Sequence, residues 1–185
     1  MAVKKWIPVL MAIVLLAGGC SIYDRVGPGL HRNHFQHFSF DIKAENWMSN
    51  PYSPGFLMSK DGYDINYIYV SREKLNTDLG LTKQRFLQGM EPFELSDVDK
   101  DRIRCNGGIT RFQVQADEPV KIDGHRGYRL EYSYTTYQGL DVRGIRYGFI
   151  HDRWIYQIIY EGLSDHYFEK NRLDFEEFLG SFKVL

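Results

Sequence analysis

The sequence lacks the short motifs that carry the best-known enzyme chemistries. It contains no G-x-G-x-x-G or Walker phosphate loop, no G-x-S-x-G nucleophile turn, no H-E-x-x-H metal motif and no C-x-x-C pair. These absences exclude the enzyme classes that a sequence reveals directly. We therefore expect a protein without catalytic activity and without a cofactor.

Long apolar runs are also missing. The first apolar stretch, 6–17, contains Pro8 and is shorter than the roughly 20 residues needed to cross a bilayer core. Two lysines precede this stretch and two glycines follow it. A charged start, a short apolar stretch and small residues before a cleavage site are typical of a secretory signal peptide, so we expect residues 1–19 to be removed.

Residues 16–20, Leu-Ala-Gly-Gly-Cys, resemble the lipobox of bacterial lipoproteins. The resemblance implies cleavage before Cys20, followed by acylation of its sulfur and of the new amino group. The family prefers leucine three positions before the cysteine, where this chain has Ala17. Since each buried methylene contributes about 0.8 kcal/mol, three acyl chains would anchor the protein permanently to the lipid bilayer.

The residue after the lipobox cysteine carries sorting information in lipoproteins of double-membraned bacteria. Here it is Ser21 rather than aspartate, which implies the outer membrane, with the domain facing the periplasm. The alternative is an ordinary secretory signal in which Cys20 occurs by chance.

Neither sign of charge dominates the chain, whose formal net charge is −1. Without the two lysines of the signal peptide, 21 of the 23 basic residues remain against 24 acidic ones. Because phosphate binding needs a basic surface, this balance predicts no nucleic-acid partner.

Cysteine is scarce as well, with two in the whole chain. If Cys20 is linked to lipid, Cys105 is left alone and no intrachain disulfide can form. Arg102 and Arg104 could lower the pKa of the Cys105 thiol. The alternative is an unreactive, partly buried thiol.

The mature chain divides into a short leader and one domain. Residues 20–34 contain a Gly-Pro-Gly sequence and no hydrophobic period, which predicts a lipidated cysteine and a tether that could reach about 50 Å. Residues 35–185 suit a single domain. Alternating apolar and polar residues predict strands over 35–42 and 109–115, and an Asp-Gly pair predicts a hairpin around residues 60–62.

The clearest pattern lies in the second half of the chain. Three alternating segments, 128–134, 143–150 and 154–160, are separated by short turns and predict an antiparallel meander. Apolar stripes predict one helix over 81–93 and a final helix from about residue 164. Between them, 97–108 is expected to be a polar loop. Together these elements predict an α+β fold in which an antiparallel β-sheet is sandwiched by helices.

Three segments of the last third carry a family resemblance. They are Ile122-Asp-Gly-His-Arg-Gly-Tyr-Arg-Leu-Glu-Tyr132, Asp152-Arg-Trp-Ile-Tyr-Gln-Ile-Ile-Tyr160 and Phe178-Leu-Gly-Ser-Phe182. They resemble the PsbP fold family, which includes an extrinsic protein of photosystem II and DcrB-type bacterial lipoproteins. The resemblance implies a PsbP-like sheet between helical layers, and it implies no activity, because the fold hosts non-catalytic proteins of diverse roles.

Three histidines, His31, His34 and His37, are the weak candidates for metal binding. Neutral imidazole binds zinc, copper or nickel. A closed structural site normally needs four ligands, and ordering a flexible segment costs backbone entropy. We therefore expect weak metal binding at most, the alternative being a polar tether that carries histidines.

Four polar residues of the meander form a second candidate site: Arg129, Glu131, Arg146 and Gln157. Gly144 and Gly148 flank Arg146 in strand period and could leave space above it for a carboxylate or phosphate ligand. The alternative is an ordinary charge pair such as Arg129 with Glu131. The tyrosines of the meander could line a glycan or peptide groove, or they could belong to the core.

Two functions follow as hypotheses. The first is a non-enzymatic envelope lipoprotein, held by the outer membrane, that binds a protein partner or supports an envelope assembly. The second is a lipoprotein that binds a small molecule or a metal. A hydrolase stands behind both, and it would need a nucleophile such as Ser133 beside a histidine.

Overall fold

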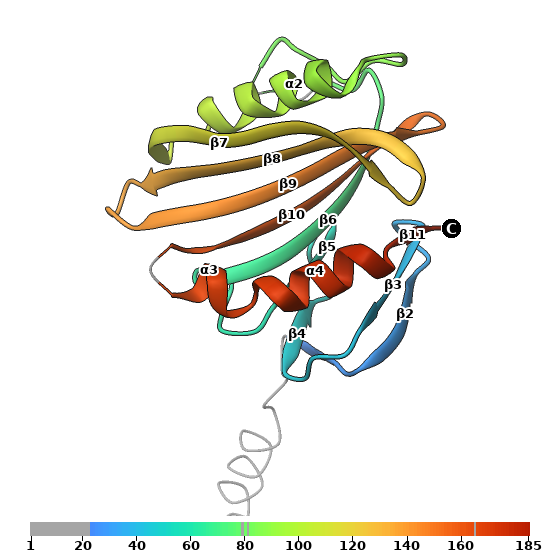
Figure 1. The fold of residues 1–185 in the computed structure, drawn as a ribbon, viewed down its shortest axis with the longest axis vertical. Coiled ribbons are helices and arrows are strands. Elements are labelled where there is room, and N and C mark those ends of the chain that lie inside the picture. The colour runs from blue at the N-terminus through green and yellow to red at the C-terminus, as the bar shows by residue number, and fades with distance from the viewer. Residues whose placement is uncertain (1–22, 79, 81, 165) are drawn as a thin grey trace, which may run out of the picture.

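The computed structural model describes residues 23–185 apart from 79, 81 and 165, so the expected signal peptide and Cys20 lie outside the described residues (Figure 1). The elements are β1 (Asp24–Val26), β2 (Gly29–Asn33), β3 (Phe38–Ile42), β4 (Trp47–Asn50), β5 (Phe56–Ser59), β6 (Asn66–Lys74), α2 (Pro92–Arg104), β7 (Ile109–Ile122), β8 (His125–Thr136), β9 (Asp141–His151), β10 (Trp154–Leu163), α3 (Tyr167–Lys170), α4 (Arg172–Ser181) and β11 (Lys183–Val184). Among these described residues, no helix is long and apolar enough to cross a membrane.

The strands of the described residues form two antiparallel sheets. The larger has eight strands in the order β1-β4-β5-β6-β10-β9-β8-β7, and the smaller has three in the order β11-β3-β2. The predicted hairpin is β5 paired with β6, and the predicted meander is β8, β9 and β10 in consecutive antiparallel register. Both predictions are confirmed.

Two hydrophobic cores lie on opposite faces of the eight-stranded sheet. β10 serves both, because Tyr156, Ile158 and Tyr160 belong to one core while Ile155 belongs to the other. Figure 1 shows α2 on one side of the sheet and α3 and α4 on the other. The predicted antiparallel sheet is confirmed, and the small sheet, whose β3 packs on α4, is a further cover that the prediction of helical layers lacked.

The final helix is held by its phenylalanines. Phe168, Phe175, Phe178 and Phe182 are each at most 1% exposed. The ring centroid of Phe178 lies 4.6 Å from that of Phe40 on β3, so α4 and the small sheet share one core. The apolar stripe predicted from the sequence is therefore confirmed, although the helix is divided into α3 and α4.

The helix predicted over 81–93 is wrong. The described residues between 82 and 91 are irregular, and Gly89 has a positive φ of 85°. The helix begins instead at Pro92, a first-turn position where the missing N–H costs no hydrogen bond. Glu91 and Glu94 form a capping box there. The loop still buries one of its apolar residues: Phe86 is 2% exposed and packs under α2, whereas Leu87 is 45% exposed.

The polar loop predicted over 97–108 is wrong for residues 97–104, because α2 continues to Arg104, and right for residues 105–108, which connect α2 to β7. The buried face of this helix carries Leu95, Val98, Asp99 and Ile103. These positions have helical spacing, but a carboxylate interrupts the apolar stripe and hides the pattern.

The tether predicted over 20–34 is wrong for residues 24–33, which form β1 and β2. β1 extends the large sheet by pairing with β4, and β2 pairs with β3. Short strands without a hydrophobic period are stable here because an existing sheet edge supplies their backbone hydrogen bonds and Val26 is 5% exposed in the core. The domain therefore begins well before residue 35.

The far edge of the large sheet is irregular. Its last strand, β7, shifts register against β8 between Thr110 and Gln113 and again between Val114 and Ala116. Arg111 lies between these points with a φ of 51°. Bulges of this kind twist an edge strand and interrupt its ladder of hydrogen bonds.

Candidate functional site

A buried group of polar side chains joins α2 to the sheet. Asp99 of α2 is 0% exposed, and its carboxylate accepts from Arg146 Nη1 at 2.8 Å, Gln157 Nε2 at 3.0 Å and Tyr128 Oη at 2.7 Å. Arg102 of the same helix donates to Gln157 Oε1 at 3.0 Å. The helix is thus fixed to β8, β9 and β10 by hydrogen bonds as well as by apolar contact.

Neighbouring charges in this group shift one another's pKa values. Burial alone would lower the pKa of the Arg146 guanidinium, but Asp99 and Tyr132 raise it well above its ordinary value. Burial, and after it the charge of Asp99, raises the pKa of Tyr128 well above its ordinary value. Arg146 is therefore a cation and Tyr128 a neutral donor at any physiological pH.

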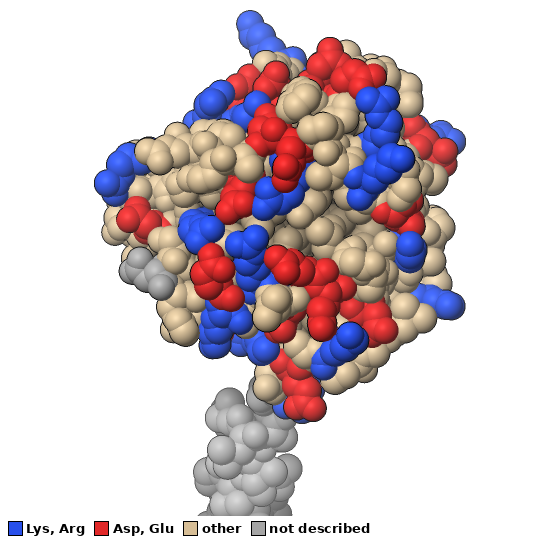
Figure 2. Space-filling model, viewed as in Figure 1, with Lys and Arg blue, Asp and Glu red and all other residues tan. Residues whose placement is uncertain are grey.

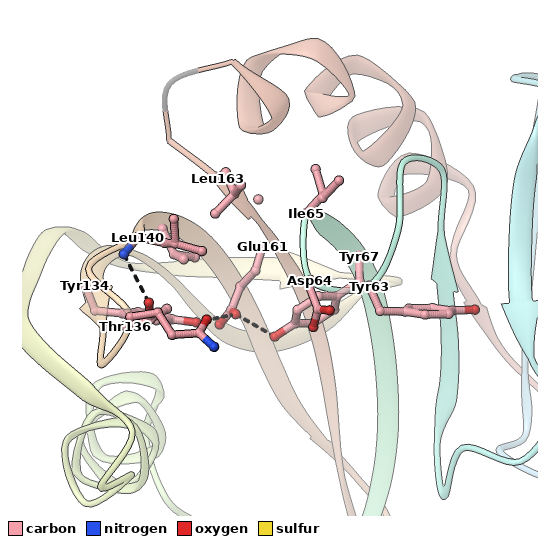
Figure 3. Close-up of a pocket in the computed structure, with 12 residues that line it drawn as sticks. Tyr63, Asp64, Ile65, Tyr67, Tyr134, Thr136, Leu140, Glu161 and Leu163 are labelled. Atoms are coloured by element: carbon pink, nitrogen blue, oxygen red, sulfur yellow. Dashed lines mark hydrogen bonds between the residues drawn. The ribbon is translucent and has the colours of Figure 1, made fainter.

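Next to this group, Glu161 of β10 is surrounded by three phenols. The carboxylate is 5% exposed and accepts from Tyr132 Oη at 2.5 Å, Tyr67 Oη at 2.5 Å and Tyr134 Oη at 2.8 Å. Figure 3 shows Tyr67 and Tyr134 reaching it from either side. Arg146 Nη2 lies 3.9 Å from Glu161 Oε1 and links the two polar groups.

An open groove runs over Glu161 on the face of the sheet that α2 covers in part. It consists of two adjoining cavities of about 330 and 360 Å³, which share Tyr67, Tyr134 and Glu161. α2 packs mainly on β7 and β8, so the neighbouring surface of β6 and β10 is left uncovered. We call this feature the tyrosine groove. Its far end reaches Tyr63, and its other end lies beside Arg102 of α2.

The side chains of the tyrosine groove are suited to binding rather than to proton transfer. Burial, and after it the charge of Glu161, raises the pKa of Tyr67 and of Tyr134. None of the residues that the structure describes in the groove lining is a histidine, cysteine or lysine. The hydroxyl of Ser133, the nucleophile a hydrolase would need, accepts from Gln115 Nε2 at 2.7 Å outside this groove. The groove offers aromatic faces and hydroxyl groups around the Glu161 carboxylate, and two arginines, Arg102 and Arg146, in one of its two cavities.

The four polar residues predicted as one ligand site are divided between the two faces of the sheet. Arg146 and Gln157 meet at Asp99 under α2. Arg129 and Glu131 lie on the opposite face, where Arg129 Nη2 donates to Glu131 Oε2 at 2.6 Å. Glu131 also accepts a hydrogen bond from Arg143 of β9. Arg143 in turn donates to Glu169 of α3, so this network connects the sheet to that helix. The four residues therefore cannot bind one ligand together in this geometry.

The space expected above Arg146 is filled by aromatic rings. A Cβ placed on Gly144 would lie 2.5 Å from Cζ of Tyr132, and one on Gly148 would likewise meet the ring of Tyr128. Both phenols lie flat across glycines of the neighbouring strand, and in this position their hydroxyl groups reach Asp99 and Glu161. The two glycines therefore make room for the tyrosine rings and leave no space for a ligand.

The three candidate histidines lie around the β2–β3 turn. His31 Nε2 bonds to the carbonyl of Gly27 at 2.6 Å, and its ring stacks on Phe40. His37 occupies the turn with a φ of 55°. Within the described residues, no group of three or more potential metal ligands converges. Weak metal binding by His31, His34 and His37 stays a prediction, as does any reactivity of Cys105, which is exposed.

The polar residues that matter most in this geometry were missed from the sequence. Asp99 lay in a segment expected to be a loop, and Tyr67 lay in a strand of unremarkable composition. Glu161 had a visible signal, because it is the single charged residue in the otherwise apolar second half of β10. A charge in such a position predicts a buried partner.

The arrangement of an antiparallel sheet, one helix on one face and a final helix on the other defines the PsbP-like fold. The solution structure of cyanobacterial PsbP from Synechocystis sp. PCC 6803 matches over 91% of this chain and 96% of its own, with a TM-score of 0.59 and 13% identity. No family model and no curated protein matches the sequence itself.

Two further solved structures share this fold. LpqN of Mycobacterium tuberculosis, described as involved in cell envelope biogenesis, matches over 88% of this chain and 90% of its own, with a TM-score of 0.57 and 12% identity. The Ran-binding protein Mog1p of Saccharomyces cerevisiae matches over 88% and 96%, with a TM-score of 0.54 and 10% identity. At these identities the likeness shows the fold alone.

Proposed function

We propose that this chain is a non-enzymatic envelope lipoprotein, anchored to the outer membrane through acylated Cys20, whose domain faces the periplasm and binds a protein partner in the tyrosine groove. The observation that carries the partner-binding role is the uncovered face of β6 and β10 beside α2. Tyr67, Tyr69 and Tyr134 line it over a floor whose polar groups are already hydrogen-bonded.

Tyrosine is suited to such a surface. Its ring supplies apolar contact area while its hydroxyl group stays hydrogen-bonded, and it is enriched in protein interfaces. Because Glu161 and Asp99 already have donors for their oxygens, a partner would lie on the phenols without having to satisfy a buried charge. The groove therefore presents a pre-formed surface that a partner could cover at small cost.

The comparisons support an accessory role. The neighbours with this fold include a cyanobacterial PsbP, a protein involved in cell envelope biogenesis and a Ran-binding protein, so one scaffold carries different proteins. The envelope neighbour fits the compartment that the lipobox of this chain implies.

The anchor is tested by two substitutions in the full precursor. Cys20→Ser should abolish lipidation and leave precursor or soluble protein, whereas the parent chain should fractionate with the outer membrane. Ser21→Asp should keep the lipid and move the protein to the inner membrane. If Cys20→Ser still fractionates like the parent chain, the protein is not anchored through this residue.

The groove is tested by site-specific photo-crosslinking from the anchored protein. A photoreactive phenylalanine analogue replaces Tyr69 in the groove, and the same analogue replaces Leu173, which is 74% exposed on α4, as a matched control. We expect one discrete adduct from position 69 and none from position 173. Equal adducts from both positions, or none from position 69, would show that the groove is not the binding surface.

A small-molecule ligand is the second candidate function. The cavities of about 330 and 360 Å³ fall in the lower part of the range of ligand sites, and Arg102 and Arg146 lie at one end of the larger cavity. Native mass spectrometry of the protein released gently from its membrane distinguishes the two functions. A bound small molecule that is lost in Tyr69→Ala would favour the ligand.

A further inference from the structure

The domain begins only a few residues after the expected lipid anchor. Tyr23 is the first described residue, and Cys20 precedes it by three positions. A fully extended chain covers at most about 3.6 Å per residue, so three residues reach about 11 Å. The tether expected from the sequence, with its reach of about 50 Å, would have held the domain clear of the lipid. The observed strands remove that freedom.

The first strand fixes which part of the domain is held close. β1 pairs with β4 so that Asp24 lies opposite Ser49, and Tyr23 therefore lies beside Asn50. The loop that follows Asn50 carries Tyr52, whose side chain is 81% exposed. An exposed aromatic residue thus lies two positions along the chain from the place where the domain begins.

A second exposed ring lies next to this loop. Phe35, at the tip of the β2–β3 turn, is 91% exposed. Gln36 Nε2 donates to the carbonyl of Pro54 at 3.0 Å, so the turn and the loop are in contact. Between them is a hollow of about 390 Å³ lined by Phe35 and by residues 49–51 and 53–56. We call the two rings and the backbone that carries them the aromatic seat.

We propose that the aromatic seat lies against the lipid bilayer in the anchored protein, with Phe35 and Tyr52 at the depth of the headgroups. The proposal rests on the proposed acylation of Cys20. Tyrosine is enriched at membrane interfaces, and phenylalanine is common on the buried face of interfacial segments, because their rings leave water while polar atoms stay hydrated.

The exposed charges near the seat are two arginines and one aspartate, Asp24 of β1. Arg25 of β1 and Arg32 of β2 are exposed, and neither forms an ion pair within the part of the chain that the structure describes. Positive side chains next to a bilayer are attracted to the phosphate groups and anionic lipids of its surface. With the net charge of the chain slightly negative, such attraction is local and depends on the anchor to bring the seat to the lipid.

This placement orients the tyrosine groove. The ring of Tyr63 at one end of the groove lies 5.2 Å from that of Tyr23, so this end opens near the bilayer. Figure 1 shows α2, beside the other end, at the opposite end of the domain from β4. A partner in the groove would therefore extend from the lipid surface outward.

Brominated lipids test the depth of the seat in the full-length, lipidated protein. Phe35→Trp and Tyr52→Trp are reconstituted separately into vesicles of phosphatidylethanolamine and phosphatidylglycerol that carry bromine near the acyl carbonyl groups. Phe93→Trp is the matched control, because Phe93 is 52% exposed on α2, at the opposite end of the domain from β4 (Figure 1). The parent protein gives the background from Trp47 and Trp154.

We expect the fluorescence of Phe35→Trp and Tyr52→Trp to be quenched at least threefold more than that of Phe93→Trp. Equal quenching at all three positions, in protein that still sediments with the vesicles, would overturn the seat while leaving the anchor in place. Protein that carries no lipid and does not sediment would overturn both the anchor and the seat. Sedimentation and the mass of the Cys20 peptide therefore distinguish the two failures.

Discussion

Asp99 on α2 and Arg146 on β9 form an ion pair of 2.8 Å whose carboxylate is completely shielded from solvent. Their positions in the sequence are 47 residues apart, yet together they decide how α2 sits on the sheet. Either charge, buried without the other, would lack its partner and would cost a large desolvation free energy. Figure 2 shows that acidic and basic side chains are likewise interspersed on the visible surface, without a large field of one sign.

The two members of this ion pair should differ in the cost of their removal. Asp99→Ala leaves Arg146, Gln157 and Tyr128 without their shared acceptor, and we expect a loss of about 3–5 kcal/mol in the free energy of unfolding. Arg146→Met leaves Asp99 with two donors and should cost less. Urea unfolding of both variants and of the double variant measures the difference. A larger loss in Arg146→Met would contradict the central place of Asp99.

Glycines under tyrosine rings should not tolerate a methyl group. Gly144→Ala places its Cβ against the buried ring of Tyr132, and we expect overpacking to cost about 1–3 kcal/mol. Gly180→Ala is the control, because no atom lies within 4 Å of the added Cβ and the residue is helical. The control should raise stability by up to about 1 kcal/mol. Thermal unfolding shows the two signs, and a neutral Gly144→Ala would mean that the ring can move aside.

Phe178 should be among the most sensitive positions of the core. Phe178→Ala removes a ring that is 0% exposed between α4 and β3, and we expect a loss of about 3–5 kcal/mol. Leu173→Ala, on the exposed side of the same helix, should change stability by less than about 0.5 kcal/mol. A melting temperature of Phe178→Ala within error of the parent protein would show that α4 is not held by this stripe.

The buried phenols make stability fall in alkaline solution. Burial raises the pKa of Tyr67, Tyr128 and Tyr132 well above that of the unfolded chain, which is about 10. A raised pKa of an acid means that the folded state keeps its proton longer. The resulting stability is complete below pH 10 and is lost as the pH rises beyond it, by about 1.4 kcal/mol per unit and per phenol.

Tyrosinate absorbance at 295 nm, followed together with circular dichroism between pH 8 and 12, measures this effect. The three buried phenols should titrate only as the fold is lost. Titration of every tyrosine near pH 10 in folded protein would contradict the burial of the three phenols around Asp99 and Glu161.

Zinc should change the stability of the protein little. His31, His34 and His37 lie around one turn, and His31 already bonds to a backbone carbonyl. A tight site would raise the free energy of unfolding by about 2.7 kcal/mol at a hundredfold excess over its dissociation constant. Calorimetry with added zinc should show far less. A large stabilisation that disappears when all three histidines are replaced by alanine would establish a metal site.

The meander and the final helix could be predicted from the sequence because their patterns are local. Alternation over 128–134 and 154–160, and the spacing of Phe168, Phe175 and Phe178, place side chains on one face whatever the rest of the chain does. The same reasoning failed where a pattern depended on distant partners. Asp99 interrupts the stripe of α2, and only Arg146, far along the chain, makes its burial possible.

The two misassigned segments before α2 and before β3 failed for related reasons. Phe86 and its apolar neighbours have helical spacing, but Gly89 turns the chain and the residues pack as a loop. Residues 24–33 have too few apolar side chains for their pattern to predict a strand. They fold because β3 and β4 present free backbone groups to them, which is a property of the assembled sheet rather than of the segment.

The irregular strand at the far edge of the sheet has a consequence for a protein held on a surface. If the protein is anchored as proposed, its copies meet in two dimensions at high local density, where a straight outer strand would let one sheet continue into the next. Three features of β7 interrupt the row of backbone groups that another strand could pair with. They are its register shifts, the positive φ of Arg111 and the missing amide hydrogen of Pro119. Under the proposed anchoring, copies crowded on a membrane would therefore not join their sheets through β7.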